Sequence, residues 1–577
     1  MSYCKLEGRR NLGRKRMKVV IVGGVAGGAT AAARIRRLDE KAEIVIFERT
    51  GNISYANCGL PYFIGDVITD PDALTLQSPE GFFRRFRIKA KIHHEVLEIL
   101  PEKKTVIVKN LETGNVFEEK YDKLLLSPGA KPILPKMESG DRVFTLRTVE
   151  DTFRIKSYIQ QKAPQSVVLA GGGFISLELA ENLRGLGLDV TIVQSGSQLM
   201  KPFDYDMAAF IHNEMRRNGV QLTFNAKVEK IVDTDKGVSV ILDNGCSVKA
   251  DIAIVAIGVV PDAELAKKAG LTLGIKGSIL VNDKMETSAQ DIYAVGDAVQ
   301  VKNYVTEKDD LIALAGPANK QGRIAADNIC GLDSHFNGSQ GSSVLKIFDL
   351  TAATTGISEK KARSLGFDTD SVILSPMSHA GYYPDAMVMT MKVVFERNTY
   401  KLLGGQIVGY DGVDKRIDVL ATAIRAGMKA TELKEFDLAY APPYSSAKDP
   451  VNMAGFMIDN IEQGILKQWH IGDIEKLPRD GSATLLDTRT VGEFQRGHIE
   501  GFFNIPVDEL RERLDEIDKN KPVYVICQSG LRSYISCRIL EGNGFTAYNF
   551  AGGFRFYQAV MNDRALVKRA TLCGMDN

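Results

Sequence analysis

Two segments of the sequence place a buried strand, a glycine-rich turn and a helix of small residues in direct succession. The first runs KVVIVGGVAGGATAAARIRRL over 18–38, and the second runs SVVLAGGGFISLELAENLRGLGLDVTIVQ over 166–194. In such a unit the amide groups at the start of the helix face the pyrophosphate of a dinucleotide. The repeated unit predicts an α/β chain with two Rossmann-like domains, each holding one dinucleotide.

The first unit carries the outer glycines of the dinucleotide fingerprint, Gly23 and Gly28, with Val25 in place of the middle glycine. The next strand, IVIFER over 44–49, ends in Glu48, 20 residues beyond Gly28. A carboxylate at this distance is expected to bind a ribose hydroxyl. We therefore predict that Gly23, Gly28 and Glu48 bind a cofactor.

The second unit has Gly171 and Gly173, but Ser176 replaces the third glycine and Gln194 stands where the ribose-binding acid belongs. A carboxylate there would bind the 2′-hydroxyl of NAD and repel the 2′-phosphate of NADP, whereas glutamine does neither strongly. The nearest cation is Lys201. We predict NADH as the cofactor, with NADPH as an alternative.

A reactive cysteine lies between a predicted strand and a predicted helix near the C-terminus. PVYVI over 522–526 has the character of a buried strand, SYISCRILEGNGF over 533–545 has helical spacing, and Cys527 follows the strand directly. Gly530 permits a sharp turn, the loop amides form an anion nest, and Arg532 adds a positive charge. These features lower a thiol pKa and stabilise a persulfide anion.

The segment before this loop, LLDTRTVGEFQRGHIEGFFNIP over 485–506, resembles the front half of a rhodanese domain. The resemblance implies that Cys527 accepts sulfur and that 528–532 cradle it. Four residues separate Cys527 from Arg532, one fewer than in tyrosine-phosphatase loops, and the smaller ring favours sulfur over a phosphoryl group. His498 is expected to be a packing or turn residue.

Length, charge and cysteine content narrow the class of protein. The 577 residues, 44% hydrophobic and 25% charged, suffice for three or four domains, and a net charge of +1 favours neither nucleic acid nor an anionic membrane as partner. No apolar run is long enough to span a membrane. Seven irregularly spaced cysteines favour a reducing cytoplasm, and no metal site is predicted. The basic segment 1–16 is expected to be a disordered extension.

Two further motifs, LLLSPGAKPI over 124–133 and IYAVGDAV over 292–299, follow the glycine units. Together the four segments resemble the pyridine nucleotide-disulfide oxidoreductases, a family of two-dinucleotide flavoproteins. The resemblance implies FAD in the first unit, with Asp297 on its ribityl chain, and NAD in the second. It implies a FAD-binding domain at 17–148 and 280–335, an NAD-binding domain at 149–279, an α+β dimerisation domain at 336–460, a linker at 461–474 and a rhodanese α/β domain at 475–570.

The reaction depends on Cys58 in SYANCGLPY over 54–62. Disulfide-reductase relatives carry a second cysteine five positions on, but Phe63 stands there, so no internal disulfide forms. Cys58 then cycles either as a sulfenic acid or as a mixed disulfide with a small thiol. Peroxidase relatives carry a histidine in the first glycine turn, which the VAGG turn lacks.

SYANCGLPY resembles the active-site segment of coenzyme A disulfide reductases, which implies that Arg37, Ser54 and Asn57 contact coenzyme A. HAGYYPDA over 379–386 and LAYAPPYSSAKDPVNMAGF over 438–456 resemble the dimerisation domain of that family. There, two tyrosines of the partner subunit approach the active-site sulfur. The resemblance implies a homodimer in which Tyr383 and Tyr440 take this role, with Tyr382 an alternative to Tyr383.

The combined motifs predict an NAD(P)H-dependent flavoprotein that reduces CoA disulfide, CoA persulfide or polysulfide through Cys58, with Cys527 handling sulfane sulfur. The alternative is an NADH oxidase or peroxidase that uses a Cys58 sulfenate. In both cases the substrate is a small molecule.

Overall fold

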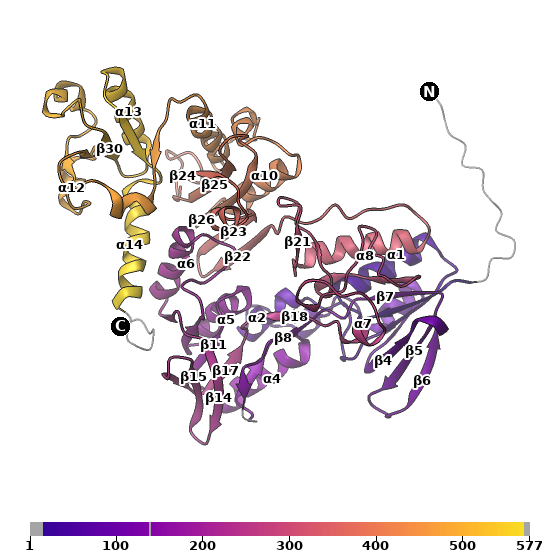
Figure 1. Ribbon diagram of the computed structural model, residues 1–577. Coiled ribbons are helices and arrows are strands. Elements are labelled where there is room, and N and C mark those ends of the chain that lie inside the picture. Colours follow the sequence, from indigo (N-terminus) through magenta and orange to yellow (C-terminus); the bar gives the residue numbers. More distant parts are fainter. Residues whose placement is uncertain (1–15, 138–139, 570–577) are drawn as a thin grey trace, which may run out of the picture. The chain divides into compact units, whose positions relative to one another are not determined.

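The computed structural model describes residues 16–137 and 140–569, so the extension predicted at 1–16 lies outside the described residues apart from Arg16 (Figure 1). The chain divides into two compact units. The first comprises 16–133, 147–157 and 259–339, and the second comprises 134–146, 158–258 and the residues from 340 onward. The predicted α/β fold class is confirmed in both units.

The first unit is built on a parallel sheet with the strand order β19-β7-β1-β2-β3. Its strands are β1 (Lys18–Val22), β2 (Glu43–Phe47), β3 (Ile88–Lys91), β7 (Lys123–Leu126) and β19 (Ile292–Ala294). An antiparallel sheet joins β4 (His94–Leu100), β5 (Thr105–Asn110) and β6 (Val116–Lys120), and shorter pairs join β8 (Ala130–Pro132) to β18 (Val259–Pro261) and β20 (Val301–Lys302) to β21 (Asp309–Asp310). The helices are α1 (Ala26–Leu38), α2 (Leu60–Ile64), α3 (Pro79–Phe86), α7 (Glu264–Lys268) and α8 (Ala315–Ile329), and α4 (Val149–Lys162) begins in this unit.

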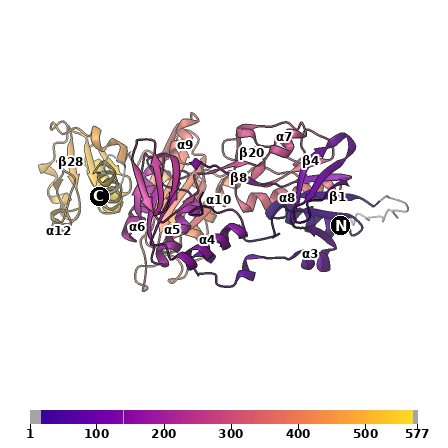
Figure 2. The ribbon, with the colours of Figure 1, turned by 90° about the horizontal axis from the view of Figure 1, so that it is seen from below.

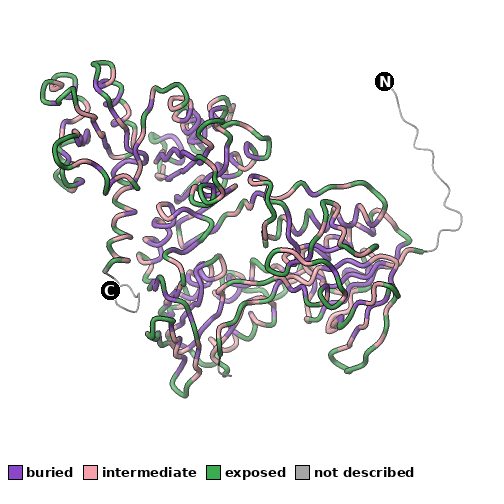
Figure 3. Tube along the Cα trace, in the orientation of Figure 1, coloured by how far each residue is buried: buried purple, intermediate pink, exposed green. Residues whose placement is uncertain are grey.

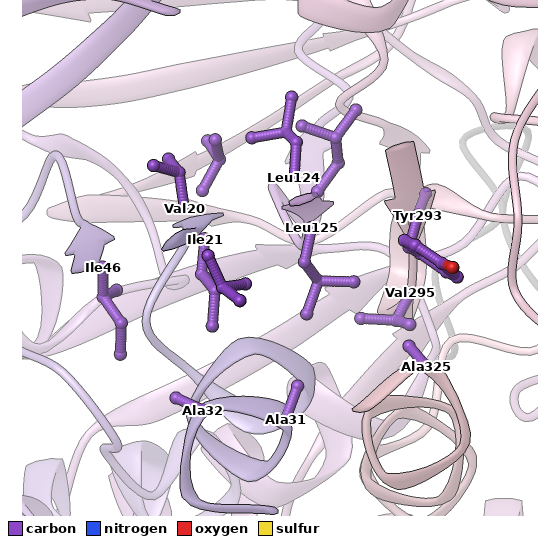
Figure 4. Packing of buried hydrophobic residues seen from close by; sticks show 14 of the residues in the cluster. Val20, Ile21, Ala31, Ala32, Ile46, Leu124, Leu125, Tyr293, Val295 and Ala325 are labelled. Carbon is purple, nitrogen blue, oxygen red and sulfur yellow. The ribbon is translucent and has the colours of Figure 1, made fainter. Parts of the chain in front are cut away.

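Small residues let two helices approach the core sheet of the first unit and each other. Ala31 and Ala32 of α1 lie under Ile21, while Ala325 of α8 lies near Val295 (Figure 4). A Cβ atom on Gly322 of α8 would come within 2.4 Å of a backbone oxygen of α1. Close helix contact on the sheet explains why α1 is so rich in alanine and glycine.

The second unit contains the other Rossmann-like sheet, with the parallel strand order β10-β17-β11-β12-β13. Its elements are β10 (Val143–Thr145), β11 (Ser166–Ala170), α5 (Phe174–Gly185), β12 (Asp189–Val193), α6 (Tyr205–Arg217), β13 (Gln221–Thr223) and β17 (Ile252–Val255). A smaller sheet joins β9 (Lys136–Met137), β14 (Val228–Thr234), β15 (Gly237–Leu242) and β16 (Ser247–Ala250). The buried backbone follows these strands, and exposed residues lie at their connecting turns (Figure 3).

An antiparallel sheet follows, in the order β22-β23-β26-β25-β24. Its elements are β22 (Ser343–Ile347), β23 (Leu350–Gly356), α9 (Glu359–Ser364), β24 (Thr369–Leu374), β25 (Thr390–Glu396), β26 (Leu402–Gly409), α10 (Val413–Arg425) and α11 (Pro450–Glu462). This is the α+β arrangement expected for the dimerisation domain.

The C-terminal part of the second unit is a parallel sheet in the order β27-β31-β30-β28-β29. Its elements are β27 (Gln468–Trp469), β28 (Thr484–Asp487), α12 (Val491–Gln495), β29 (Phe503–Asn504), β30 (Val523–Ile526), α13 (Leu531–Gly542), β31 (Ala547–Phe550) and α14 (Gly553–Arg569). Trp469 is buried against Phe550, with ring centroids 4.3 Å apart. Two elements reach into the predicted linker 461–474: α11 ends at Glu462, and the C-terminal sheet begins at Gln468. The limits of the domains stay predictions.

The final helix, α14, packs against α6 of the second Rossmann-like sheet (Figures 1 and 2). The contact is polar at its centre, where fully buried His212 and Asp563 meet, with Nδ1 and Oδ2 2.9 Å apart. Nε2 of His212 accepts the amide of Leu199 at 3.0 Å, so Nδ1–H donates to Asp563. Arg216 also donates to Asp563, and the rings of Phe210 and Phe556 stack beside the pair. We call this contact the α6–α14 latch.

Candidate cofactor and sulfur sites

The first glycine turn is shaped by close backbone contacts. Gly23 has a φ of +93°, and a Cβ there would lie 2.1 Å from the carbonyl oxygen of Ser127. A Cβ on Gly28 would lie 2.0 Å from the carbonyl oxygen of Gly23, so both positions require glycine. Glu48 accepts the amide of Gly24 at 2.9 Å, which holds its carboxylate beside the turn. The arrangement fits a nucleotide whose ribose meets Glu48.

Asp297 lies in a short turn, Gly296–Ala298, that directly follows β19. Because β19, β7 and β1 are parallel, this turn and the first glycine turn lie at the same edge of the sheet. The amide of Gly296 donates to the buried side chain of Gln321 at 2.7 Å, and Arg147 lies 3.6 Å from the Asp297 carboxylate. The residues fit FAD. Gln321 and Arg147 have no local sequence signal, since Gln321 comes from α8 and Arg147 from the bend before α4.

The second glycine turn combines a tight backbone with open space. Gly171 has a φ of +109°, and a Cβ there would lie 2.3 Å from the carbonyl oxygen of Ala256. A Cβ on Gly173 would meet nothing within 4 Å, which leaves room for a pyrophosphate. The side-chain amide of Gln194 donates to the carbonyl of Gln198 at 3.1 Å. Lys201 is exposed beyond it.

No sequence motif indicated Glu178 as a residue of interest near the second glycine turn. It lies on α5, and burial, together with the nearby charge of Glu181, raises the pKa of its carboxyl group to about 7. Ser176, two residues earlier, is fully buried, and within the described residues its hydroxyl has no hydrogen-bond partner. A glutamate in a helix of this composition carries no pattern that predicts its titration.

Cys58 is exposed on a short helical turn, Asn57–Gly59, which is followed by α2 with Pro61 in its first turn. The preceding loop is bound to the first glycine turn, because the amide of Ser54 donates to the carbonyl of Gly24 at 2.8 Å. Ser54 itself has a φ of +49°. A backbone hydrogen bond therefore joins the loop bearing Cys58 to the first glycine turn.

Three other predicted residues can be placed around this loop. Phe63 is buried and packs edge-on against Phe153 at 5.6 Å. Asn57 is exposed beside Cys58. Arg37 is exposed in the last turn of α1, the helix that begins at the glycine turn.

The tyrosine loops of the antiparallel domain bring two hydroxyl groups together. Tyr382 and Tyr440, both exposed, share a hydrogen bond of 2.8 Å, and this bond raises the pKa of Tyr382. Tyr383 instead lies edge-on to the ring of His379 at 5.7 Å. The structure therefore pairs Tyr440 with the alternative residue Tyr382 rather than with Tyr383.

Buried Arg416 of α10 holds the two tyrosine loops together. Its guanidinium donates to the carbonyl of Ser378 at 2.8 Å and to the hydroxyl of Ser445 at 3.1 Å, and it pairs with the Asp449 carboxylate at 3.0 Å. The amide of Ala380 donates to the carbonyl of Ser445 at 3.0 Å. Arg416 comes from a separate helix, so the loop sequences gave no indication of it.

Cys527 directly follows β30 and precedes α13, as predicted, and Gly530 adopts a φ of +103°. The sulfur is fully buried. Sγ accepts the amide of Gly530 at 3.1 Å and the hydroxyl of Ser533 at 3.2 Å. The start of α14 supports the loop from behind, because the amide of Phe554 donates to the carbonyl of Cys527 at 2.7 Å. Donors directed at Sγ favour a charged sulfur.

Arg532, predicted to add a positive charge to this loop, is paired with a carboxylate of α12. Its guanidinium makes two hydrogen bonds of 2.7 Å to the carboxylate of Glu493, and these bonds lower the pKa of Glu493 to about 2. The positive charge is therefore shared with α12. Ser533, which contacts the sulfur directly, lies one residue beyond the predicted cradle 528–532.

The remaining residues of the sequence analysis are placed as follows. His498 is exposed and stacks on Phe494 with centroids 3.9 Å apart, which fits a packing role. Burial raises the pKa of Cys330 to about 11 and also raises that of Cys537, which disfavours the thiolate at both. Within 16–137 and 140–569, no helix combines the length and apolarity needed to cross a membrane.

Comparison with known families agrees with this organisation. The pyridine nucleotide-disulphide oxidoreductase model matches 17–322, the dimerisation domain of that family matches 342–450, and the rhodanese-like domain matches 471–559. A coenzyme A disulfide reductase of Staphylococcus epidermidis is 38% identical over 440 residues, which cover 76% of this chain and 99% of the relative.

Solved structures of related proteins resemble the chain over most of its length. Reduced Bacillus anthracis CoADR-RHD is 46% identical with a TM-score of 0.92, covering 96% of this chain and 99% of that one. An NAD-dependent persulfide reductase from A. fulgidus is 37% identical with a TM-score of 0.88, covering 94% and 100%. A water-forming NADH oxidase from Lactobacillus brevis, bound to NADH, is 29% identical with a TM-score of 0.74, covering 78% and 100%. The chain belongs to the pyridine nucleotide-disulphide oxidoreductase family and carries a C-terminal rhodanese-like domain.

Proposed function

We propose that this chain reduces CoA disulfide, CoA persulfide or polysulfide with NAD(P)H at Cys58, while Cys527 accepts and delivers sulfane sulfur. The observation that carries the proposal is the Cys58 loop. Its sulfur is exposed, its backbone is hydrogen-bonded to the first glycine turn, and a packed Phe63 stands where a second cysteine would be needed. The similarity to CoA disulfide and persulfide reductases supports this choice.

Gly23, Gly28, Glu48 and Asp297 would hold FAD, and Gly171, Gly173 and Gln194 would hold NAD(P)H. When bound, FAD supplies the transfer of two electrons from NAD(P)H to sulfur. The Cys58 thiolate attacks one sulfur of the substrate, that S–S bond breaks, and one thiol leaves. Without a resolving cysteine at 63, coenzyme A stays on Cys58 as a mixed disulfide until the two electrons release it.

The placement of Arg37, Ser54 and Asn57 suits an extended ligand. The Cys58 loop is bound to Gly24 just before α1, and Arg37 lies at the far end of that helix. Arg37 lies eleven positions beyond the first residue of α1, which is about 16 Å along the helix axis. A molecule as long as coenzyme A could contact Asn57 and Ser54 near its thiol and Arg37 near its phosphates.

A homodimer would supply the proton for the departing thiolate. The Tyr382–Tyr440 pair of the partner subunit would approach Cys58, and the bond between the hydroxyls would orient one O–H toward sulfur. Such a general acid contributes modestly, because the pKa of a leaving thiol lies near 8.5. Arg416 would keep both loops in place.

The second glycine unit supports the use of both nicotinamide cofactors. An engineered NADPH oxidase, solved with NADPH, differs from its NADH-bound parent at a glycine and at 18, 19, 20 and 25 residues beyond it. The changes remove an aspartate at the first of these four positions and introduce arginine at the second and fourth. Counted from Ser176, the first and fourth positions here are Gln194 and Lys201, so this chain has no repelling carboxylate and carries a cation for a 2′-phosphate.

The test compares NADH oxidation with CoA disulfide, CoA persulfide, polysulfide and oxygen as acceptors. We expect Cys58→Ser to bind FAD and accept hydride but to lose CoA disulfide reduction. Cys527→Ser should retain that reduction and lose the use of polysulfide. Oxygen as the preferred acceptor, with no adduct of CoA mass on Cys58 in unreduced enzyme, would support the oxidase alternative instead. Loss of CoA disulfide reduction in well-folded Cys527→Ser would refute the division between the two cysteines.

A further inference from the structure

Ser533 lies in the first turn of α13, and its hydroxyl has two acceptors within reach. Oγ is 3.2 Å from Sγ of Cys527 and 3.1 Å from the carbonyl oxygen of Gly530. The serine and the sulfur are both fully buried. We propose that Ser533 is a catalytic residue of the rhodanese-like domain whose hydroxyl stabilises the Cys527 thiolate as the leaving group when sulfur is delivered. The proposal rests on the sulfur-carrying role given to Cys527 above.

Delivery is the step that creates charge on the buried sulfur. The thiolate of an acceptor attacks the outer sulfur of the protonated Cys527 persulfide, and a new S–S bond forms. The bond between Sγ and the outer sulfur breaks, its electron pair returns to Sγ, and the proton leaves with the acceptor persulfide. A full negative charge then resides on a sulfur without solvent contact, which is costly unless hydrogen-bond donors face it.

Two donors face Sγ among the described residues, the Gly530 amide and the Ser533 hydroxyl. The Arg532 guanidinium makes two hydrogen bonds to Glu493, so its charge is shared with that carboxylate, and it does not donate to Sγ. The direct hydrogen bonds to the leaving thiolate therefore come from the two neutral donors at Sγ. Of these, the hydroxyl is the one that a side-chain substitution can remove.

The Gly530 carbonyl, as a second acceptor, explains why the Ser533 hydroxyl accelerates the delivery of sulfur more than the reverse step, the loading of Cys527. In the loaded persulfide, Sγ carries no full charge, and the hydroxyl can donate to the Gly530 carbonyl instead. As the S–S bond breaks, the proton turns to Sγ, where the bond is now to a charged group and stronger. Only an interaction that strengthens toward the transition state raises the rate.

Ser536 provides a matched control on the same helix. It is also fully buried, but its hydroxyl donates to the carbonyl of Arg532 at 2.9 Å. Ser536→Ala therefore removes a buried hydroxyl from α13 without removing a donor to sulfur. A purely structural role for serines in this helix predicts the same effect at both positions.

The experiment follows the two half-reactions separately in full-length enzyme. Cys527 is loaded with polysulfide, and the loaded enzyme is rapidly mixed with cyanide, which removes the outer sulfur as thiocyanate. We expect Ser533→Ala to slow delivery about 100-fold, the low end of the effect of removing an oxyanion donor. Loading should change less, so the equilibrium fraction of persulfide on Cys527 in a mixture of CoA and CoA persulfide should rise. Ser536→Ala should behave as wild type.

A second pair of variants keeps the test valid if Ser533→Ala folds poorly. Ser533→Thr retains the hydroxyl. Ser533→Val introduces a side chain of nearly the same shape as threonine but without the hydroxyl. Threonine should restore delivery to within about fivefold of the serine rate, whereas valine should remain slow. Equal rates for threonine and valine, a wild-type rate for alanine, or equal losses at 533 and 536 would overturn the proposal. Loss of both half-reactions in Cys527→Ser tests the sulfur-carrying role independently.

Discussion

The α6–α14 latch predicts a loss of stability that can be worked out from one carboxylate. Asp563 is fully buried and accepts hydrogen bonds from His212, Arg216 and Tyr205, which lower its pKa from an ordinary 3.8 to about 2. At about 1.4 kcal/mol per pKa unit, this shift corresponds to roughly 2.4 kcal/mol of stability at neutral pH. Asp563→Asn should remove this amount or somewhat more, since Arg216 would lose its ionic partner.

The sign of the pH dependence follows from the lowered pKa. The stabilisation is complete above about pH 5, where the carboxyl is ionised in both folded and unfolded chains, and it is lost as the pH falls toward 2. The difference between wild type and Asp563→Asn should therefore stay constant from pH 6 to 8.

Trp469 provides the assay. It is the single tryptophan of the sequence and is buried in the C-terminal sheet, so its fluorescence follows unfolding of the rhodanese-like domain. With a urea slope of 1–3 kcal/mol per M, the midpoint should fall by about 1–2 M. Gln558→Ala, an exposed change on the same helix, is the control. An unchanged midpoint in Asp563→Asn, or an equal fall in the control, would refute the contribution of the latch.

Three further predictions concern the reductase sites. Tyr382→Phe and Tyr440→Phe should each slow CoA thiolate release about 10- to 100-fold in rapid-mixing traces while leaving hydride transfer unchanged. Tyr383→Phe should have little effect. Wild-type rates in the first two variants would mean that these tyrosines only pack at the interface. Glu178→Gln should raise the free energy of unfolding at pH 8 by about 2–3 kcal/mol, because a pKa near 7 means that ionisation of Glu178 destabilises the folded chain. This destabilisation grows as the pH rises from 4.5 to 7. A gain of equal size at pH 5 would contradict this explanation. Lys201→Glu should raise KM for NADPH at least about tenfold with little change for NADH; equal changes for both cofactors would exclude a 2′-phosphate contact.

Local patterns in the sequence predicted those parts of the fold that depend on neighbouring residues. The glycine turns at 23–28 and 171–173 and the strand-to-helix turn at Cys527 lie where their motifs indicated, because backbone geometry at these places is set by glycine and by the flanking elements. The roles given to the individual site residues remain proposals.

Contacts between distant segments could not be predicted in this way. Arg416 reaches the tyrosine loops from α10, and Glu493 reaches Arg532 from another helix, so neither pair has a fixed spacing in sequence. The choice between Tyr382 and Tyr383 depends on which of two adjacent side chains a loop turns toward Tyr440. A sequence motif cannot distinguish the roles of two adjacent residues of the same type.

The α6–α14 latch also bears on how this gene can be cut or rearranged. A stop codon placed before the rhodanese-like domain would not yield a smaller version of the same enzyme, because α6 would be left presenting Phe210, His212 and Arg216 without the helix that covers them. Conversely, the domain expressed alone would expose Asp563 and Phe556 on its last helix. Exchange of the domain between related chains would succeed only where both helices are exchanged or where their facing residues already match.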